Sequence, residues 1–463
     1  MKSRLSLQEL IDCGLLSIMI IFPLSVNVAF SSLNDFQHPL IAINISLASL
    51  LIGIIFLLWI LKIAIAKEWS KIKLLPLPIL IFFIIEILSF VNAFSLSEWI
   101  KEIVQTIVYL ILFYILLLNN LKTFNLKTFK NVLFILTTLI LILSFIQHSI
   151  LKGDVYLIKG LFENRNILGI YLCMMMPFIY AELLSTTYIL RRLWMTLLLI
   201  LSIIVITSGS AILSLIISLI VVSFYHSKKV LYRFLFTLLV IGILYPFIMP
   251  QKNITAVKEF ASIYEQGSIS QNYYRRLLLL TNSEDQKILL NKELNGKFLR
   301  IKTTDLLSAK LPAPNIGDRY KDIDSIKHIM NRYVEVQAAL NLMAENVLLG
   351  IGLGNFQNEI GVYYKELPKI NTSEPYQTNT YLLLGATIGL LGLSAFLWVL
   401  LHSLNNSIFK FRNTNGEKKY FYLGLFGAIL SIIIEGFFSY ILVSILMVPF
   451  VFILFLSNKE IDL

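Results

Sequence analysis

GIGLGNF, residues 350–356, lies in the last part of the longest polar stretch of the chain, which runs from Pro250 to Tyr376. The motif YQTNTY, residues 376–381, follows it and opens the next apolar run. On both sides of this stretch the chain consists of apolar runs of about 20 residues, the length that a helix needs to cross the hydrocarbon core of a bilayer. The pattern predicts a multi-spanning membrane protein with one large polar loop, which serves recognition or chemistry at one membrane face.

Composition supports the membrane class, because 57% of the 463 residues are hydrophobic and 32 are Phe, far above the averages of soluble proteins. Hydropathy predicts an all-α polytopic protein with about twelve transmembrane helices. These spans are expected near residues 10–31, 40–62, 75–93, 103–119, 131–149, 167–185, 193–208, 210–226, 231–249, 378–403, 419–437 and 439–457. The predicted domains are a membrane domain with spans 1–9 (residues 1–249), an outer loop (250–376) and spans 10–12 (377–463).

The distribution of Lys and Arg predicts the orientation of the chain in the membrane. With both termini in the cytoplasm, the cytoplasmic ends and short connections hold nineteen Lys and Arg residues. The opposite short connections hold four, namely Lys101, Lys152, Lys159 and Arg165. The large polar loop is therefore expected to face away from the cytoplasm, into a periplasm or the extracellular space.

Several kinds of site are disfavoured by the sequence. Cys13 and Cys173 both lie in apolar runs, where a free thiol behaves as a small hydrophobe, so neither a metal site nor a disulfide is predicted. The glycines at 350, 352 and 354 lack the preceding strand and the following acidic residue of a dinucleotide fingerprint. Anchoring of cytoplasmic Lys and Arg beside anionic lipid accounts for most of the net charge of +11, so no nucleic-acid partner is expected. No cofactor is predicted either.

Within the polar loop, apolar residues at helical spacing predict one strong amphipathic helix over residues 326–347, ending near Gly350. Its apolar stripe is expected to press against the outer ends of the spans, and it consists of Ile326, Ile329, Tyr333, Val336, Leu340, Met343 and Val347. A weaker helix is predicted near residues 270–280, and residues 282–324 are expected to form irregular surface.

Several motifs together resemble the O-antigen ligase and polymerase superfamily. They cover roughly residues 155–395 and comprise FENRNIL (162–168), TSGS (207–210), the run from Arg332 through GIGLGNF, NTYL (379–382) and IGLLG (388–392). The loop motif is the most specific of them. Twelve spans with a large outer loop between the ninth and tenth also resemble the layout of this family.

The resemblance implies a metal-independent, membrane-embedded glycosyltransferase. Such enzymes move a glycan from undecaprenyl diphosphate to a saccharide acceptor, which is lipid A core for a ligase and a growing glycan for a polymerase. The reaction needs donors that stabilise a leaving diphosphate, a task for which arginine is suited by its permanent charge and fixed fork of N–H groups. It also needs a base for the acceptor hydroxyl.

Outward-side arginines are the predicted groups for the diphosphate. Arg332 on the strong helix and Arg275 and Arg276 on the weaker one are candidate catalytic residues, and Arg165 with Asn166 forms a candidate substrate-binding pair at the start of the sixth span. The alternative interpretation is that these arginines are solvated surface charges. Glu335, three residues after Arg332, is a ready partner for such a charge.

The base is where the chain departs from the family. Thr378 stands where ligases carry a histidine, and Ala211 stands where the family usually has an arginine, which favours a polymerase or a divergent transferase. Glu435, inside an apolar run near the outer face, is a candidate catalytic, site-lining residue, because a carboxylate there is costly without a cavity or partner. His328, His148 and Glu86 are weaker candidates. A structural hydrogen bond would explain either carboxylate.

Gln377, Asn379 and Tyr381 are predicted to bind sugar hydroxyls or phosphate at the entrance of the tenth span. They could equally cap its helix, a role in which Asn is favoured. The alternative function is a transporter or flippase for a polysaccharide or small solute. Transporters usually show internal repeats and interrupted helices, and the sequence shows no repeat, so a transferase is favoured.

Overall fold

The computed structural model describes residues 7–23, 27–31, 42–120, 126–150, 158–162, 164–248, 335–336, 338–356 and 379–459. Its contacts divide the chain into two units. The first comprises residues 1–232, 339–356 and 376–463, and the second comprises residues 233–338 and 357–375. The structural features described below belong to the first unit, except for residues 233–248, which form most of helix α10, and residues 335–338, which belong to the second.

The chain begins with helix α1 (Leu7–Ile21) and helix α2 (Leu47–Ala66), which pack against each other. Between them, strands β1 (Asn27–Ser31) and β2 (Ala42–Ser46) form an antiparallel pair in which Asn27 lies opposite Ser46. The first two predicted spans are therefore too long, because they included these residues as helix. Residues 43–46 of β2, with the sequence INIS, alternate apolar and polar residues, a period of two that favours a strand.

Helix α3 (Leu77–Leu88) starts with a proline in its first turn and runs into a short 3-10 helix (Ser89–Asn92). Helix α4 (Leu96–Gln105) follows and continues through a π-helical segment, Thr106–Leu112, into α5 (Phe113–Asn120). The predicted fourth span is thus one continuous helical segment that begins earlier than expected and contains a π-helix, a rare conformation found often at functional sites.

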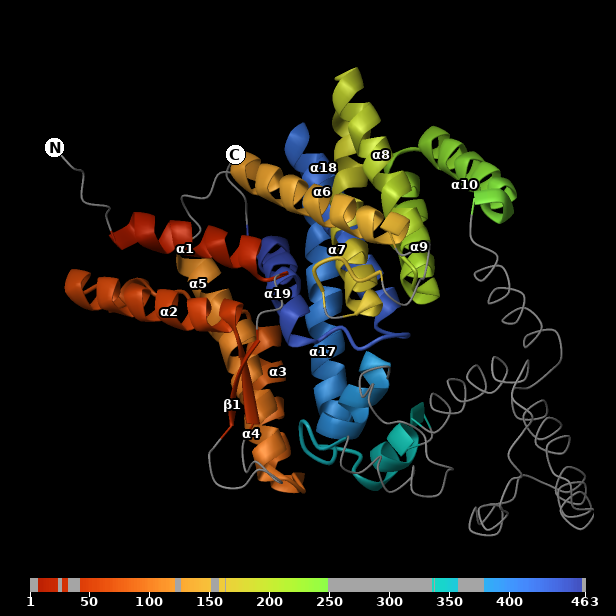
Figure 1. Ribbon diagram of the computed structural model, residues 1–463. Coiled ribbons are helices and arrows are strands. Elements are labelled where there is room, and N and C mark those ends of the chain that lie inside the picture. Colours follow the sequence, from red (N-terminus) through yellow and green to blue (C-terminus); the bar gives the residue numbers. More distant parts are fainter. Residues whose placement is uncertain are drawn as a thin grey trace, which may run out of the picture. The chain divides into compact units, whose positions relative to one another are not determined.

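The middle of the chain adds helices α6 (Leu126–Ile150), α7 (Arg165–Ser185), α8 (Ile189–Val205), α9 (Gly209–His226) and α10 (Lys228–Ile248). Helix α7 is the central one, since almost every residue from Ile167 to Ala181 is buried. It packs against α8, α9 and α18 (Glu417–Glu435), with α18 beside it along its length (Figure 1).

Helix α17 (Thr380–Asn413) is not the straight span that hydropathy predicted. The chain reverses at Gly389, whose φ of 70° and ψ of −175° are not helical. The rings of Tyr381 and Phe396 lie 6.4 Å apart, although fifteen residues of straight helix would separate their Cα atoms by about 22 Å. Residues 380–388 therefore form a short helix that folds back on the long helix starting at Leu390.

The last helix, α19 (Ser444–Asn458), contains Pro449 and packs against α5, α17 and α18. Each predicted span overlaps a helix, which confirms the helical class apart from the strand pair. Among the described residues, six helices are long and apolar enough to cross a membrane by length and composition. The number of twelve spans, the domain boundaries and the outward position of the loop stay predictions.

Candidate functional site

Glu435 ends α18 and lies at the centre of a buried polar cluster. Its carboxylate accepts hydrogen bonds from the hydroxyls of Ser210 (3.0 Å), Ser214 (2.8 Å) and Ser439 (2.8 Å). The side chain is only 1% exposed. Ser210 and Ser214 are four residues apart on α9, so one face of that helix presents both hydroxyls to the same carboxylate. The sequence predicted Glu435 as a site-lining residue, and the structure gives it partners rather than an open cavity.

The start of α17 adjoins this cluster through Thr380. The Thr380 N–H donates to the Gly436 carbonyl (2.9 Å). Its hydroxyl donates to the Ser439 carbonyl (2.6 Å) and accepts from the Ile441 N–H (3.0 Å). These bonds join the first turn of α17 to the chain that leaves α18.

Asn379 and Tyr381 are held in structural roles in this arrangement. The Asn379 side chain caps α17 by accepting from the N–H groups of Tyr381 (2.8 Å) and Leu382 (3.2 Å). The Tyr381 hydroxyl donates to the Ile433 carbonyl (2.7 Å), and its ring packs on Phe437 with 4.6 Å between centroids. Capping was the alternative interpretation of Asn379, and the structure supports it.

Arg165 and Asn166 begin α7, where Asn164 caps the helix by accepting from the Ile167 N–H (2.9 Å). Both side chains are half-buried. One turn further, Gly169 lies against the start of α9, because a Cβ there would be 2.9 Å from the Ala211 Cβ. The first turns of α7, α9 and α17 and the end of α18 therefore lie at the same end of the helices.

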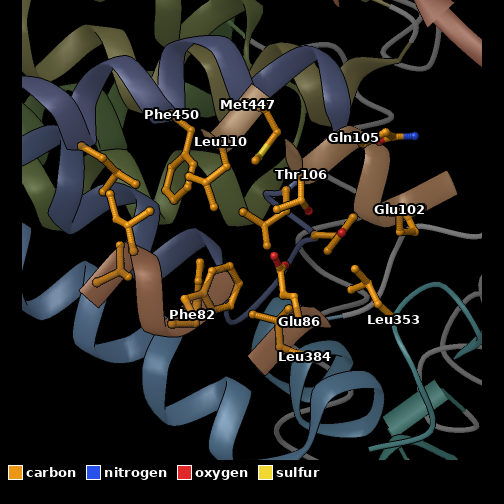
Figure 2. Close-up of a pocket in the computed structure, with 16 residues that line it drawn as sticks. Phe82, Glu86, Glu102, Gln105, Thr106, Leu110, Leu353, Leu384, Met447 and Phe450 are labelled. Carbon is orange, nitrogen blue, oxygen red and sulfur yellow. The ribbon is translucent and has the colours of Figure 1, made fainter. Parts of the chain in front are cut away.

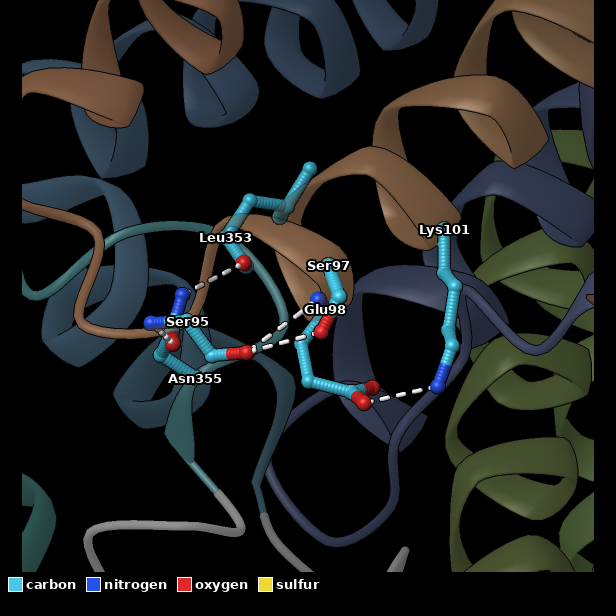
Figure 3. Close-up of polar contacts among 6 residues, drawn as sticks. All are labelled: Ser95, Ser97, Glu98, Lys101, Leu353 and Asn355. Atoms are coloured by element: carbon cyan, nitrogen blue, oxygen red, sulfur yellow. Dashed lines mark hydrogen bonds and ion pairs between the residues drawn. The ribbon is translucent and has the colours of Figure 1, made fainter. Parts of the chain in front are cut away.

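Residues 350–356, the GIGLGNF motif, form a loop that is called the docking loop below. Hydrogen bonds of asparagine side chains join it to the connection between α3 and α4. Asn355 Oδ1 accepts from the Ser95 N–H (2.6 Å), and its Nδ2 donates to the Leu353 carbonyl (3.1 Å) (Figure 3). Asn92 Nδ2 donates to the Gly350 carbonyl (3.0 Å). The loop is thus bound to a turn about 260 residues earlier in the chain.

The three glycines of the docking loop all have positive φ, between 65° and 92°. At Gly350 a Cβ would lie 2.3 Å from the Thr387 carbonyl carbon, and at Gly354 it would lie 2.9 Å from Glu102 Cγ. On the other side, the N–H groups of Ile351 and Gly352 donate to the carbonyls of the short α17 helix, each at 2.9 Å. Glycine is required here for close backbone contact, so the motif has a structural explanation.

The helix before the docking loop differs from its prediction. Residues 338–345 are helical, and the chain turns before Gly350 as expected. However, Leu340 and Val347 of the predicted apolar stripe are 51% and 45% exposed. Met343 of the stripe does pack against the short helix of α17, because a Cβ at Gly385 would lie only 2.6 Å from the Met343 Cε. The amphipathic stripe therefore does not mark the buried face in the part of this helix that the structure describes.

A pocket lies between α3, the π-helical segment, α17 and α19 (Figure 2). Its polar groups come from Glu86, Glu102, Gln105 and Thr106, and Leu353 of the docking loop contributes to its apolar wall. The sequence named Glu86 only as a weaker candidate and missed the other three. Residues 102, 105 and 106 are polar and stand where an apolar run begins. Polar residues at such a place are equally typical of the end of a membrane span, so the sequence did not single them out.

The remaining predicted site residues, Arg332, Arg275, Arg276 and Gln377, lie outside the described residues, as do His328 and Thr378. Within the described part of the chain, no group of three or more His, Cys, Asp or Glu side chains could hold a metal ion.

The segment from α8 through the docking loop to the first turns after Gly389 decides the family. Residues 194–397 match the family model of O-antigen ligases. The chain carries an O-antigen ligase family domain. This confirms the resemblance read from the motifs. The search of curated proteins gave no match.

The O-antigen ligase domain includes Ser210, Ser214, the docking loop and the folded-back helix of α17, but it ends before Glu435. Glu86 and Glu102 also lie outside the matched residues. Both carboxylate sites are therefore built where the O-antigen ligase domain meets helices from the flanking sequence.

Proposed function

We propose that this protein transfers a glycan from undecaprenyl diphosphate to a saccharide acceptor at the outer face of the bacterial cytoplasmic membrane. The match of residues 194–397 to O-antigen ligases carries the proposal. The structure adds a physical basis, since the docking loop fixes the end of the polar loop against α17 and the α3–α4 connection. Rigid attachment suits a loop that has to position a donor and an acceptor together.

In this proposal Arg332, Arg275 and Arg276 bind the diphosphate and stabilise the charge that develops as it leaves. Arg165 and Asn166, at the same end of the helices as the Glu435 cluster, are proposed to bind substrate. Glu435 is proposed to keep α9, α17 and α18 in register beside the site, because its carboxylate is already bonded to serines from two segments. Threonine at position 378 favours polymerisation over ligation to lipid A core.

The break in α17 supports a second candidate, a transporter or flippase, because interrupted helices often line transport sites. The two functions differ in where the lipid-linked glycan accumulates when the gene is deleted. A missing transferase leaves it at the outer face of the membrane, whereas a missing flippase leaves it at the cytoplasmic face.

The test is transfer by the purified protein in liposomes, with lipid-linked glycan extracted from the deletion strain. We expect the wild-type protein to release the carrier and form a larger glycan. Arg332→Ala is expected to lower the rate at least 100-fold, because one positioned donor of this kind contributes about 10²–10³ in rate. Arg412→Ala, in the last turn of α17, is the matched control and should keep the wild-type rate. Equal rates for both variants would remove Arg332 from the site.

A further inference from the structure

The pocket beside the docking loop contains a carboxylate oxygen that lacks a partner. Glu86 is 3% exposed, and its Oε2 has no hydrogen-bond partner among the residues that the structure describes. Figure 2 shows the carboxylate pointing into the pocket toward Thr106. A buried acceptor without a donor is costly, so a site of this kind is built for something that supplies one.

The backbone around this carboxylate is also unusual. Thr106, which lines the pocket, is the first residue of the π-helical segment. Such segments occur frequently at functional sites, because the extra residue costs stability unless a function retains it. Leu353 and Leu384 bring the docking loop and the short α17 helix to the same pocket. The docking loop, which is the most family-specific motif, and a carboxylate with one oxygen that lacks a partner among the described residues therefore lie at the same pocket.

The position of the pocket suits a substrate at a membrane face. Glu86 is six residues before Asn92, the end of the 3-10 helix, and Glu102 is six residues after the start of α4. Six residues of α-helix rise about 9 Å, so both carboxylates lie within two turns of the α3–α4 connection. The distribution of positive charge predicts that this connection faces outward, as the polar loop does.

The chemistry of the pocket selects a neutral group that donates hydrogen bonds. Two carboxylates repel a diphosphate, so the diphosphate of the lipid-linked glycan is not expected to bind in this pocket. A carboxylate only accepts hydrogen bonds when ionised, and hydroxyl groups supply the missing donor. The free space admits a few water-sized groups rather than a sugar ring, so a hydroxyl would enter from a sugar held at the mouth.

We propose that this pocket, the Glu86 pocket, receives the reacting hydroxyl of the saccharide acceptor and that Glu86 is the catalytic base. The assignment rests on the proposed glycan transfer. The acceptor oxygen forms a bond to the anomeric carbon of the donor, and its proton moves to the Glu86 carboxylate. The bond between that carbon and the phosphate oxygen breaks, and the carrier diphosphate leaves with the electron pair.

Other groups fit this role less well. Both oxygens of Glu435 already accept hydrogen bonds, from three serine hydroxyls in all. Threonine at position 378 cannot act as a base near neutral pH. Glu102 is half-buried and lines the same pocket. In this assignment it accepts a hydrogen bond from a second hydroxyl of the acceptor and so helps to select the hydroxyl that reacts.

The experiment uses the full-length protein in liposomes with lipid-linked glycan from the deletion strain, and measures glycan transfer and binding of the donor separately. Glu86→Gln keeps the shape of the side chain and removes the base. We expect a loss of transfer rate of 100-fold or more with donor binding within twofold of wild type, since a general base contributes about 10²–10⁴ in rate. Thr106→Val, a second variant that leaves the carboxylate in place, should lower the rate about tenfold.

Glu182→Gln is the matched control, because Glu182 lies near the other end of α7, where it pairs with Arg191 (3.0 Å), and it should transfer at the wild-type rate. Only variants with the elution profile and melting temperature of wild type are scored. A stable Glu86→Gln or Thr106→Val protein with wild-type transfer overturns the assignment while leaving the proposed function intact. Absence of transfer by the wild-type protein overturns both.

Discussion

At the scale of single residues, two buried glutamates show how the same side chain takes different roles. Glu435 has three serine hydroxyls as donors, whereas Glu86 has an oxygen with no partner in the part of the chain that the structure describes. A carboxylate with its full set of donors stabilises the helices that supply them, and one without them is available to a ligand. Hydropathy treats both as a single acidic residue in an apolar run.

Replacing Glu435 with Ala is expected to destabilise the protein, because the hydroxyls of two buried serines, Ser214 and Ser439, and of the half-buried Ser210 lose their acceptor. Each loss of this kind costs about 1–3 kcal/mol, and rotation of the hydroxyls toward backbone carbonyls recovers part, so we expect a loss of about 2–4 kcal/mol. Thermal melting of the purified protein measures it. Glu417→Ala, an exposed glutamate in the first turn of the same helix, should leave the melting temperature almost unchanged. Equal melting temperatures for the two variants would contradict a stabilising role for the cluster.

At the scale of elements, the fold-back of α17 positions the site. Beyond Gly389, the N–H groups of Leu390 and Leu391 donate to the carbonyls of Val347 (2.8 Å) and Leu348 (3.4 Å) at the end of the loop helix. The short helix before Gly389 accepts from the docking loop. The family motifs around 350 and 388 are thus two halves of one contact, which explains why both are rich in glycine.

Gly389→Ala is expected to disrupt this contact. The residue has a φ of 70°, and a Cβ would lie 2.1 Å from the Leu348 carbonyl oxygen. With a ψ of −175° this backbone conformation is essentially confined to glycine and costs about 1–3 kcal/mol for alanine, and the clash with the Leu348 carbonyl adds to that cost. We expect a fall in melting temperature of several degrees or loss of folded protein in size-exclusion chromatography.

Gly53→Ala is the matched control, because this glycine is in α2 and a Cβ there meets nothing within 4 Å. Alanine in a helix is favoured by about 1 kcal/mol over glycine, so this variant should melt at the wild-type temperature or above it. A Gly389→Ala protein as stable as Gly53→Ala would be incompatible with the fold-back.

At the scale of the whole molecule, orientation in the membrane decides which substrates can reach the site. Helix α7 has 21 residues, which at 1.5 Å per residue gives about 31 Å, the thickness of the hydrocarbon core. Asn164 before it and Thr187 after it are both exposed, so they mark its two ends. The bias of Lys and Arg predicts the Asn164 end outside.

Single cysteines test this orientation directly in intact cells. The exposed Cys13 is first replaced with Ser, and the buried Cys173 is left in place. A membrane-impermeant maleimide should label Asn164→Cys from outside and should label Thr187→Cys only after the cells are opened. The reverse pattern would place the site in the cytoplasm and contradict transfer from an outward-facing carrier.

The sequence by itself determined the helical membrane class, the family and the position of most helices, because these depend on hydropathy over about 20 residues and on local motifs. It also indicated Glu435 and the cap at Asn379 as polar groups in apolar surroundings. These signals are local in the chain, so no packing information is needed to read them.

Only the tertiary structure decided which polar groups have partners. The reversal at Gly389 and the docking of Asn355 on Ser95 depend on contacts between distant segments, and a glycine in a hydrophobic run does not reveal its φ. Among the described residues, the same contacts leave one Glu86 oxygen without a donor, while the Glu435 carboxylate receives three hydroxyl donors. Whether a buried carboxylate stabilises a fold or awaits a substrate is set by its neighbours in space, because hydrogen bonds act over about 3 Å and not along the sequence.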